Sequence, residues 1–138
     1  MAVLGLAIVA MGEELGTKMS TRVLDHVFQY GDRGAKRAVP LAHALLHVSS
    51  PELPAMDVLH RYCHDADPDV AASACLSLGL VGAGTNNARL ANMLRQLTTY
   101  FYKEPSNVFL VRVSQGLVHA GKGLLTMAPF HTDRQVTS

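Results

Sequence analysis

Four segments of small and aliphatic residues recur along this chain at a nearly constant interval. They end at Gly12, Ser49, Gly84 and Gly121, so the intervals are 37, 35 and 37 residues. A self-similar period of this length is the sequence signature of a helical solenoid, in which each repeat buries its apolar face against the next. The period therefore predicts an all-α solenoid of about three and a half two-helix repeats.

The third repeat shows the start and end of a small-residue helix most clearly. Asp67 and Pro68 are typical of a helix start, because aspartate caps the first turn and proline is tolerated at the first helical position. The residues that follow are rich in Ala, Ser and Gly, and Gly82 and Gly84 are expected to end the helix. Small side chains let neighbouring backbones approach closely, so we expect these helices to form an inner layer.

An amphipathic helix is expected after each of the first three small-residue helices. The expected ranges are residues 17–30, 51–64 and 86–103, each with apolar residues at helical spacing. Thr85 or Asn86 is expected to cap the third of these helices. Arg89, Asn92 and Arg95 are expected on its polar face, where they can contact partners.

Pro40 and the two ends of the chain interrupt this pattern. Pro40 lies inside the small-residue helix expected at residues 33–48, so a kink at residues 36–39 or a new helix start at Pro40 is expected. Residues 128–138 are expected to form a loop or frayed tail. Neither end resembles a polar capping repeat, so residues 1–138 are expected to be one segment of a longer array. Its apolar end faces are expected to make the isolated segment self-associate.

Composition limits the classes of partner and compartment. With 12 Lys and Arg against 11 Asp and Glu, the net charge of +1 implies no nucleic-acid or membrane-surface partner. The apolar first 12 residues are too few to span a bilayer, which takes about 20, so a buried helix is expected there. Cys63 and Cys75 lie in apolar helical surroundings, which favours reduced thiols in the cytosol or nucleus.

Two histidine pairs are the candidates for metal binding. His60 and His64 share a helix face, with Cys63 beside them. Zinc needs three or four converging ligands, and no second cluster supplies the rest, so structural or surface histidines are favoured and no metal site is predicted. His43 and His47 have the same spacing among leucines, and core or groove histidines are favoured there.

Charged clusters in two places have simple structural interpretations. Asp65, Asp67 and Asp69 imitate the first half of a calcium loop. The glycine and the glutamate that complete such a loop are missing, so helix capping is favoured. A small basic patch is expected from Arg22, Arg33, Lys36 and Arg37. This patch is expected to be solvated, with an interface as the alternative.

The glycine-containing turns are the remaining candidates for chemistry. The turn from Gly82 to Asn87 could form a phosphate cradle at a helix N-terminus. No strand precedes it and no Gly-Lys-Ser/Thr follows, so helix termination is favoured over a nucleotide-binding enzyme. The same interpretation applies to Gly121, Lys122 and Gly123. No nucleophile, base and acid form a recognisable set, so no catalytic residue and no cofactor are predicted.

The small-residue helices at this period resemble proteasome/cyclosome repeats. This family occurs in the two largest non-ATPase subunits of the proteasome regulatory particle and in the largest subunit of the anaphase-promoting complex. The segments that are similar to its proteasome members are residues 37–42, 64–68, 82–91, 93–97 and 115–123, in that order and spacing. The run Gly-Thr-Asn-Asn-Ala-Arg-Leu-Ala at residues 84–91 is the most specific. The resemblance covers nearly all of the chain.

The resemblance implies a function that neither the period nor the composition shows. It implies a non-catalytic scaffold segment, from the C-terminal part of a toroidal repeat domain in the base of the regulatory particle, that supports ubiquitin-dependent protein degradation. The implied partners are ATPase-ring subunits and other regulatory-particle subunits, while ubiquitin and ubiquitin-like domains dock through other parts of the full protein. The implied location is the cytoplasm and nucleus. A free-standing HEAT-like adaptor is the alternative, because residues 67–70 also resemble the turn that opens HEAT repeats.

Overall fold

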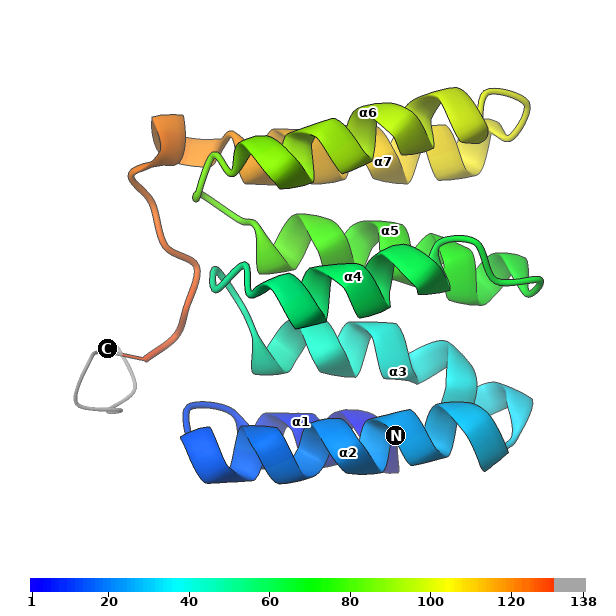
Figure 1. The fold of residues 1–138 in the computed structure, drawn as a ribbon, viewed down its shortest axis with the longest axis vertical. Coiled ribbons are helices and arrows are strands. Elements are labelled where there is room, and N and C mark those ends of the chain that lie inside the picture. The colour runs from blue at the N-terminus through cyan, green and yellow to red at the C-terminus, as the bar shows by residue number, and fades with distance from the viewer. Residues whose placement is uncertain (131–138) are drawn as a thin grey trace.

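The structure, a computed structural model, describes residues 1–130 and arranges their helices in two layers (Figure 1). The elements in this part are α1 (Ala2–Ala10), α2 (Glu14–Tyr30), α3 (Arg33–Leu46), α4 (Leu53–Tyr62), α5 (Pro68–Val81), α6 (Ala88–Tyr100), α7 (Pro105–Val118) and the short 3-10 helix η1 (Ala120–Gly123). Three helix pairs and a seventh helix make up three and a half repeats. The predicted all-α solenoid is therefore confirmed.

The inner layer consists of the small-residue helices. Helix α1 packs against α3, α3 against α5, and α5 against α7. The outer helices each pack against the inner helix that follows them, α2 on α3, α4 on α5 and α6 on α7. Figure 1 shows the repeats stacked in chain order, with α1 and α2 at one end and α6 and α7 at the other.

Small residues set the spacing of the inner layer. A Cβ atom added to Gly79 on α5 would lie 2.7 Å from the Cα atom of Ser114 on α7, closer than real Cβ contacts allow. The aligned residues of the first two repeats, Ala7 and Ala44, are fully buried. Each repeat therefore presents a residue with little or no side chain where the next inner helix packs.

A residue with left-handed backbone follows two or three positions after the end of each inner helix. These residues are Gly12 (φ 84°), Ser49 (φ 54°), Gly84 (φ 71°) and Gly121 (φ 58°), the four positions that the sequence period marks. The Ser49 amide donates to the Leu80 carbonyl at 3.2 Å, and the Gly84 amide donates to the Leu117 carbonyl at 2.9 Å. Leu80 and Leu117 occupy the same position in their repeats, so one backbone hydrogen bond recurs between successive units.

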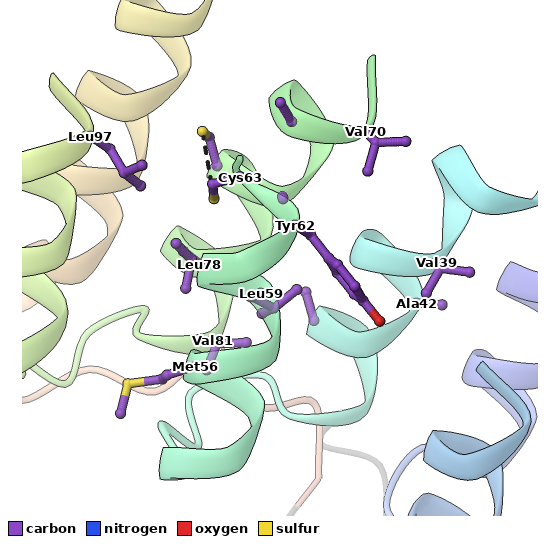
Figure 2. Close-up of a cluster of buried hydrophobic side chains, with 14 of the residues drawn as sticks. Val39, Ala42, Met56, Leu59, Tyr62, Cys63, Val70, Leu78, Val81 and Leu97 are labelled. Atoms are coloured by element: carbon purple, nitrogen blue, oxygen red, sulfur yellow. Dashed lines mark hydrogen bonds between the residues drawn. The ribbon is translucent and has the colours of Figure 1, made fainter. Parts of the chain in front are cut away.

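The core between the layers is aliphatic, as the composition indicates. Its largest fully buried apolar side chains are Leu24, Val39, Met56, Leu59, Leu78, Val81, Leu90, Leu94, Leu97, Val111 and Val118. Figure 2 shows the central part, where Leu59 of α4 lies near Leu78 and Val81 of α5. No helix within residues 1–130 is long and apolar enough to cross a membrane.

Of the two predicted helix caps, the cap of α5 is confirmed and the cap of α6 is wrong. Asp67 caps α5 as expected, because its carboxylate accepts a hydrogen bond from the Asp69 amide at 3.2 Å. Helix α6 is capped by Asn87, whose side chain accepts from two amides of the first turn, so the prediction of Thr85 or Asn86 is wrong. Asn86 has a φ of 50°, which places it in the turn before the cap.

Helix α3 is continuous through Pro40, so the predicted new start at that residue is wrong. The outer helices α4 and α6 are shorter than the expected ranges 51–64 and 86–103. Helix α4 begins only at Leu53 because Glu52 still has extended backbone, with φ −73° and ψ 138°.

A C-terminal strap, residues 124–130, crosses the ends of the inner helices (Figure 1). Its contacts are Leu125 on Gly84 and Gly121, Met127 on Ser49, and Phe130 on Gly12. The strap therefore meets the left-handed end residue of every repeat. Residues 128–130 of the expected loop or frayed tail are non-helical and belong to this strap, as the loop alternative predicts, whereas residues 131–138 lie outside the part that the structure describes.

A matched pair of glycine substitutions tests the close packing of the inner helices. We expect Gly79→Ala to lower the free energy of unfolding by about 1–3 kcal/mol, because the added methyl group collides with α7. We expect Gly116→Ala to raise it by about 0.5–1 kcal/mol, because Gly116 is helical and a Cβ atom there meets nothing within 4 Å. Urea unfolding followed by circular dichroism measures both. Equal effects from the two substitutions would contradict this packing.

Candidate protein-binding groove

A groove runs between the outer helices α2 and α4, with α3 as its floor. It consists of two adjoining hollows of about 350 Å³ and 370 Å³. They share Thr17, Lys18, His47 and Glu52 in their walls. The contacts of α2 and α4 with α3 leave this space open, because the two outer helices pack on the inner layer rather than on each other.

The walls of the groove combine apolar surface with charges of both signs. Pro54, Ala55 and Val58 supply the apolar surface from α4. Lys18, Arg22 and Asp25 line the side formed by α2, and Glu52 lies at the start of α4. A few polar groups around an apolar surface are typical of sites that recognise a protein segment or a small molecule.

His43 lies at the bottom of the groove and is only 2% exposed. Its Nε2 atom is buried without a hydrogen-bond partner, and the nearest carboxylate oxygen, Oδ1 of Asp25, is 3.7 Å away. Burial lowers the pKa of His43 from 6.5 to about 4, although Asp25 acts to raise it. The imidazole is therefore neutral at pH 7. The prediction of core or groove histidines at His43 and His47 agrees with both positions, because His47 lines the groove as well.

The candidate metal ligands around His60 do not converge. The rings of His60 and His64 meet edge to face with centroids 5.1 Å apart, and His64 also contacts Tyr100. The Sγ atom of Cys63 lies 3.9 Å from that of Cys75, and both residues are buried free thiols. The contact with Cys75 and burial raise the pKa of the Cys63 thiol. Residues 1–130 hold no group of three or more His, Cys, Asp or Glu that could bind a metal ion.

The predicted basic patch is largely an ion cluster between repeats. Arg33 donates to the Asp67 carboxylate at 2.8 Å, and Arg37 contacts Asp67 at 3.2 Å and Asp69 at 2.8 Å. The hydrogen bond from Arg33 holds the pKa of Asp67 well below its usual range. Arg33 is solvated as expected, with its side chain 73% exposed, but Arg33 and Arg37 also pair with carboxylates of the next repeat, which the prediction did not include. Asp67 both caps α5 and joins it to α3.

The glycine turns are already occupied by other parts of the chain. In the turn from Gly82 to Asn87, the amides of Gly84 and Asn86 donate to carbonyls at the end of α7, at 2.9 and 3.1 Å. Leu125 of the strap covers Gly84 and also Gly121. A phosphate would need these amides, so the geometry favours helix termination.

The polar face of α6 also links repeats. Arg89 pairs with Asp57 of α4 at 3.1 Å, whereas Asn92 and Arg95 are exposed. The sequence reasoning missed the groove, the strap and these inter-repeat ion pairs. Each depends on residues from different repeats, and the period alone shows only that the repeats are neighbours.

Comparison with known proteins finds a family of repeats that part of the chain matches. Residues 73–106 match the family described as the proteasome/cyclosome repeat. This match covers most of α5, the whole of α6 and the first two residues of α7.

Similar proteins extend over nearly the entire chain. The 26S proteasome non-ATPase regulatory subunit 2 homolog A of Arabidopsis thaliana is 58% identical over 137 residues, 99% of this chain and 15% of that protein. The 26S proteasome non-ATPase regulatory subunit 2 of Dictyostelium discoideum is 52% identical over 138 residues, 100% of this chain and 15% of that protein. The 26S proteasome regulatory subunit rpn1 of Schizosaccharomyces pombe is 50% identical over 135 residues, 98% of this chain and 15% of that protein. The chain thus spans about 15% of the length of these curated relatives.

Replacing His43 by an apolar residue tests whether its buried Nε2 atom, which has no hydrogen-bond partner, lowers the stability of the fold. We expect His43→Leu to raise the free energy of unfolding by about 1 kcal/mol at pH 7, because a buried nitrogen without a partner is removed. His47→Leu is the control, since His47 is only half-buried and should change stability less. Thermal melts of the three proteins measure the difference. A lower melting temperature for His43→Leu would show that His43 makes a favourable polar contact.

The lowered pKa of His43 predicts how the free energy of unfolding depends on pH. The folded pKa of about 4 lies below the ordinary value of 6.5, so the unfolded chain binds more protons between these two pH values. The free energy of unfolding should therefore fall as the pH decreases from 6.5 to 4, by at most about 3 kcal/mol. Urea unfolding at several pH values measures this slope. The slope should be smaller in His43→Leu, and an unchanged slope would assign it to other groups.

Proposed function

Since this chain is homologous over nearly its whole length to 26S proteasome non-ATPase regulatory subunit 2, we propose that it is a scaffold segment of the proteasome regulatory-particle base. The observation that carries the proposal is the identity of 50–58% to these regulatory subunits along the whole repeat array. In this role the segment supports ubiquitin-dependent protein degradation by holding other subunits in place. It acts in the cytoplasm and nucleus, where proteasomes degrade such substrates.

The bonds between repeats support a scaffold role. The backbone bonds of Ser49 and Gly84, the ion cluster at Asp67 and the small-residue contact at Gly79 all join one repeat to the next. A segment tied together at so many points holds its outer surface in a defined shape. Such a surface positions partners, and it has no need of a reactive group.

The groove between α2 and α4 is the surface best suited to a partner. We assign it to a segment of an ATPase-ring subunit or another regulatory-particle subunit. Ubiquitin and ubiquitin-like domains would bind through other parts of the full protein. Within that protein the chain contributes to the C-terminal part of a longer toroidal repeat domain.

The proposed role is non-catalytic. The relatives are named as regulatory subunits. The glycine turn that suggested a nucleotide site uses its amides to bind α7, which leaves the alternative of a nucleotide-binding enzyme without support.

Binding measurements with purified proteasome components test the proposal. The full chain is immobilised, and isolated ATPase-ring subunits and ubiquitin are passed over it in surface plasmon resonance. We expect at least one ATPase-ring subunit to bind. We expect Arg22→Glu, in the groove wall, to weaken that binding about tenfold, equivalent to about 1.4 kcal/mol.

Arg61→Glu is the matched control, because Arg61 is exposed on α4 and does not line the groove. It makes the same change in charge and should leave binding unaltered. Failure of every ATPase-ring subunit to bind would overturn the scaffold proposal. Binding that is equally sensitive to both substitutions would exclude the groove as the contact site.

A further inference from the structure

Two buried cysteines lie in contact where the second and third repeats meet. Cys63 ends α4, the outer helix of the second repeat, and Cys75 lies in the middle of α5, the inner helix of the third. Both are free thiols that are fully buried, and their Sγ atoms are 3.9 Å apart (Figure 2). The chain has two cysteines, so each has the other as its one possible thiol partner within the molecule.

The fold holds the two thiols with different firmness. The backbone of Cys75 is fixed between helices, because its carbonyl accepts a hydrogen bond from the Ser114 hydroxyl of α7 at 2.7 Å. Cys63 is the C-cap of α4, and the chain leaves the helix directly after it. Helix ends open locally at a lower free energy than helix centres. Cys63 can therefore move towards Cys75 while α5 and α7 keep their places.

A hollow in the surface reaches the Cys63 side of the pair. Its volume is about 300 Å³, and its walls include the buried residues Cys63 and Ala71 and the exposed residues Tyr100, Lys103 and Glu104. This space is large enough for water and for molecules of a few atoms. A small oxidant in the hollow therefore reaches the Cys63 sulfur when the end of α4 opens, and the rest of the fold stays in place.

We propose that Cys63 and Cys75 are a redox-sensitive pair, which hydrogen peroxide converts into a disulfide bond between α4 and α5. A disulfide has an S–S distance of about 2.05 Å, so rotation of the side chains and a shift at the end of α4 close the remaining gap. The bond joins the second repeat to the third covalently. In reducing surroundings the pair returns to two thiols, which is typical of disulfides that sense oxidation. This inference is independent of the proposed proteasomal role.

Hydrogen peroxide takes up the two electrons that the thiols lose. The Cys63 thiol loses its proton and its sulfur attacks one peroxide oxygen; the O–O bond breaks, and a sulfenic acid and one water form. The Cys75 sulfur then attacks the Cys63 sulfur, and the Cys75 proton leaves with the sulfenic hydroxyl group as a second water. The contact with Cys75 and burial raise the pKa of Cys63, so the first step is slow and the pair responds to sustained exposure.

The disulfide closes a ring that contains the connection between α4 and α5. The two cysteines are 12 residues apart, and the connection includes Asp67, which binds Arg33 and Arg37 of α3. The ring limits the conformations of the unfolded chain, and it also holds the segment that carries this ion cluster. Oxidation therefore stabilises the junction between the second and third repeats.

Counting the thiols of the full chain tests the inference. The folded chain is treated with hydrogen peroxide, freed of the oxidant, unfolded in urea and titrated with dithionitrobenzoate. We expect the count to fall from two thiols per chain to none, and to return to two after treatment with dithiothreitol. A non-reducing gel should show a monomer, because the bond lies within one molecule.

The melting temperature shows whether the bond stabilises the fold. The oxidised chain should melt about 5–10 °C above the reduced chain, and dithiothreitol should remove this gain. Peroxide also oxidises methionine, of which the chain has six. The matched control is the double variant Cys63→Ala and Cys75→Ala, which keeps these methionines and should gain no stability from peroxide. An oxidised chain that melts no higher than the reduced chain would contradict a stabilising link.

Three results of the thiol count would overturn the proposal. One is a count that stays at two after peroxide treatment, which would mean that the pair does not react. Another is a loss of thiols that dithiothreitol does not restore, which would mean that each sulfur is oxidised separately. The third is a disulfide-linked dimer, which would mean that the thiols react between molecules.

Discussion

The close approach of neighbouring inner helices is the constraint on which the rest of this structure depends. Gly79 leaves no room for a side chain against Ser114, and the aligned Ala7 and Ala44 are fully buried. Larger residues at these positions would push successive repeats apart. The backbone bonds from Ser49 and Gly84 to the following inner helix require the same short distance, because a hydrogen bond holds only over about 3 Å.

Polar contacts join successive repeats at both ends of the inner helices and also between them, where the Ser114 hydroxyl donates to the Cys75 carbonyl at 2.7 Å. The Asp67 carboxylate binds its own first turn and two arginines of α3 at once, and its pKa is held low as a result. At the other end of the inner helices, the strap of residues 124–130 touches the left-handed residue of every repeat. The stack is thus connected at both ends as well as through its core, which agrees with the scaffold role that we propose.

Two histidines within residues 1–130, His43 and His60, depart from this satisfied pattern, because each has a buried ring nitrogen without a hydrogen-bond partner. The Nε2 atom of His43 lies beneath the groove. Unsatisfied buried groups cost free energy, and they are often retained where a site has a role beyond stability. The groove, its charged rim and this imidazole together distinguish the first two outer helices from the rest of the array.

The sequence by itself determined the fold class, the repeat and the places where each inner helix ends. These features are local or periodic: Asp67 caps its own helix, and Gly12, Ser49, Gly84 and Gly121 follow from the period of the small-residue segments. The tertiary structure alone decided what each residue meets across the stack. Arg33 and Arg37 were recognisable as basic residues, but their partner Asp67 lies 34 and 30 residues further along the chain. The groove around His43 and the course of the strap likewise depend on how several repeats are placed side by side, because residues distant in sequence become neighbours only when the helices stack.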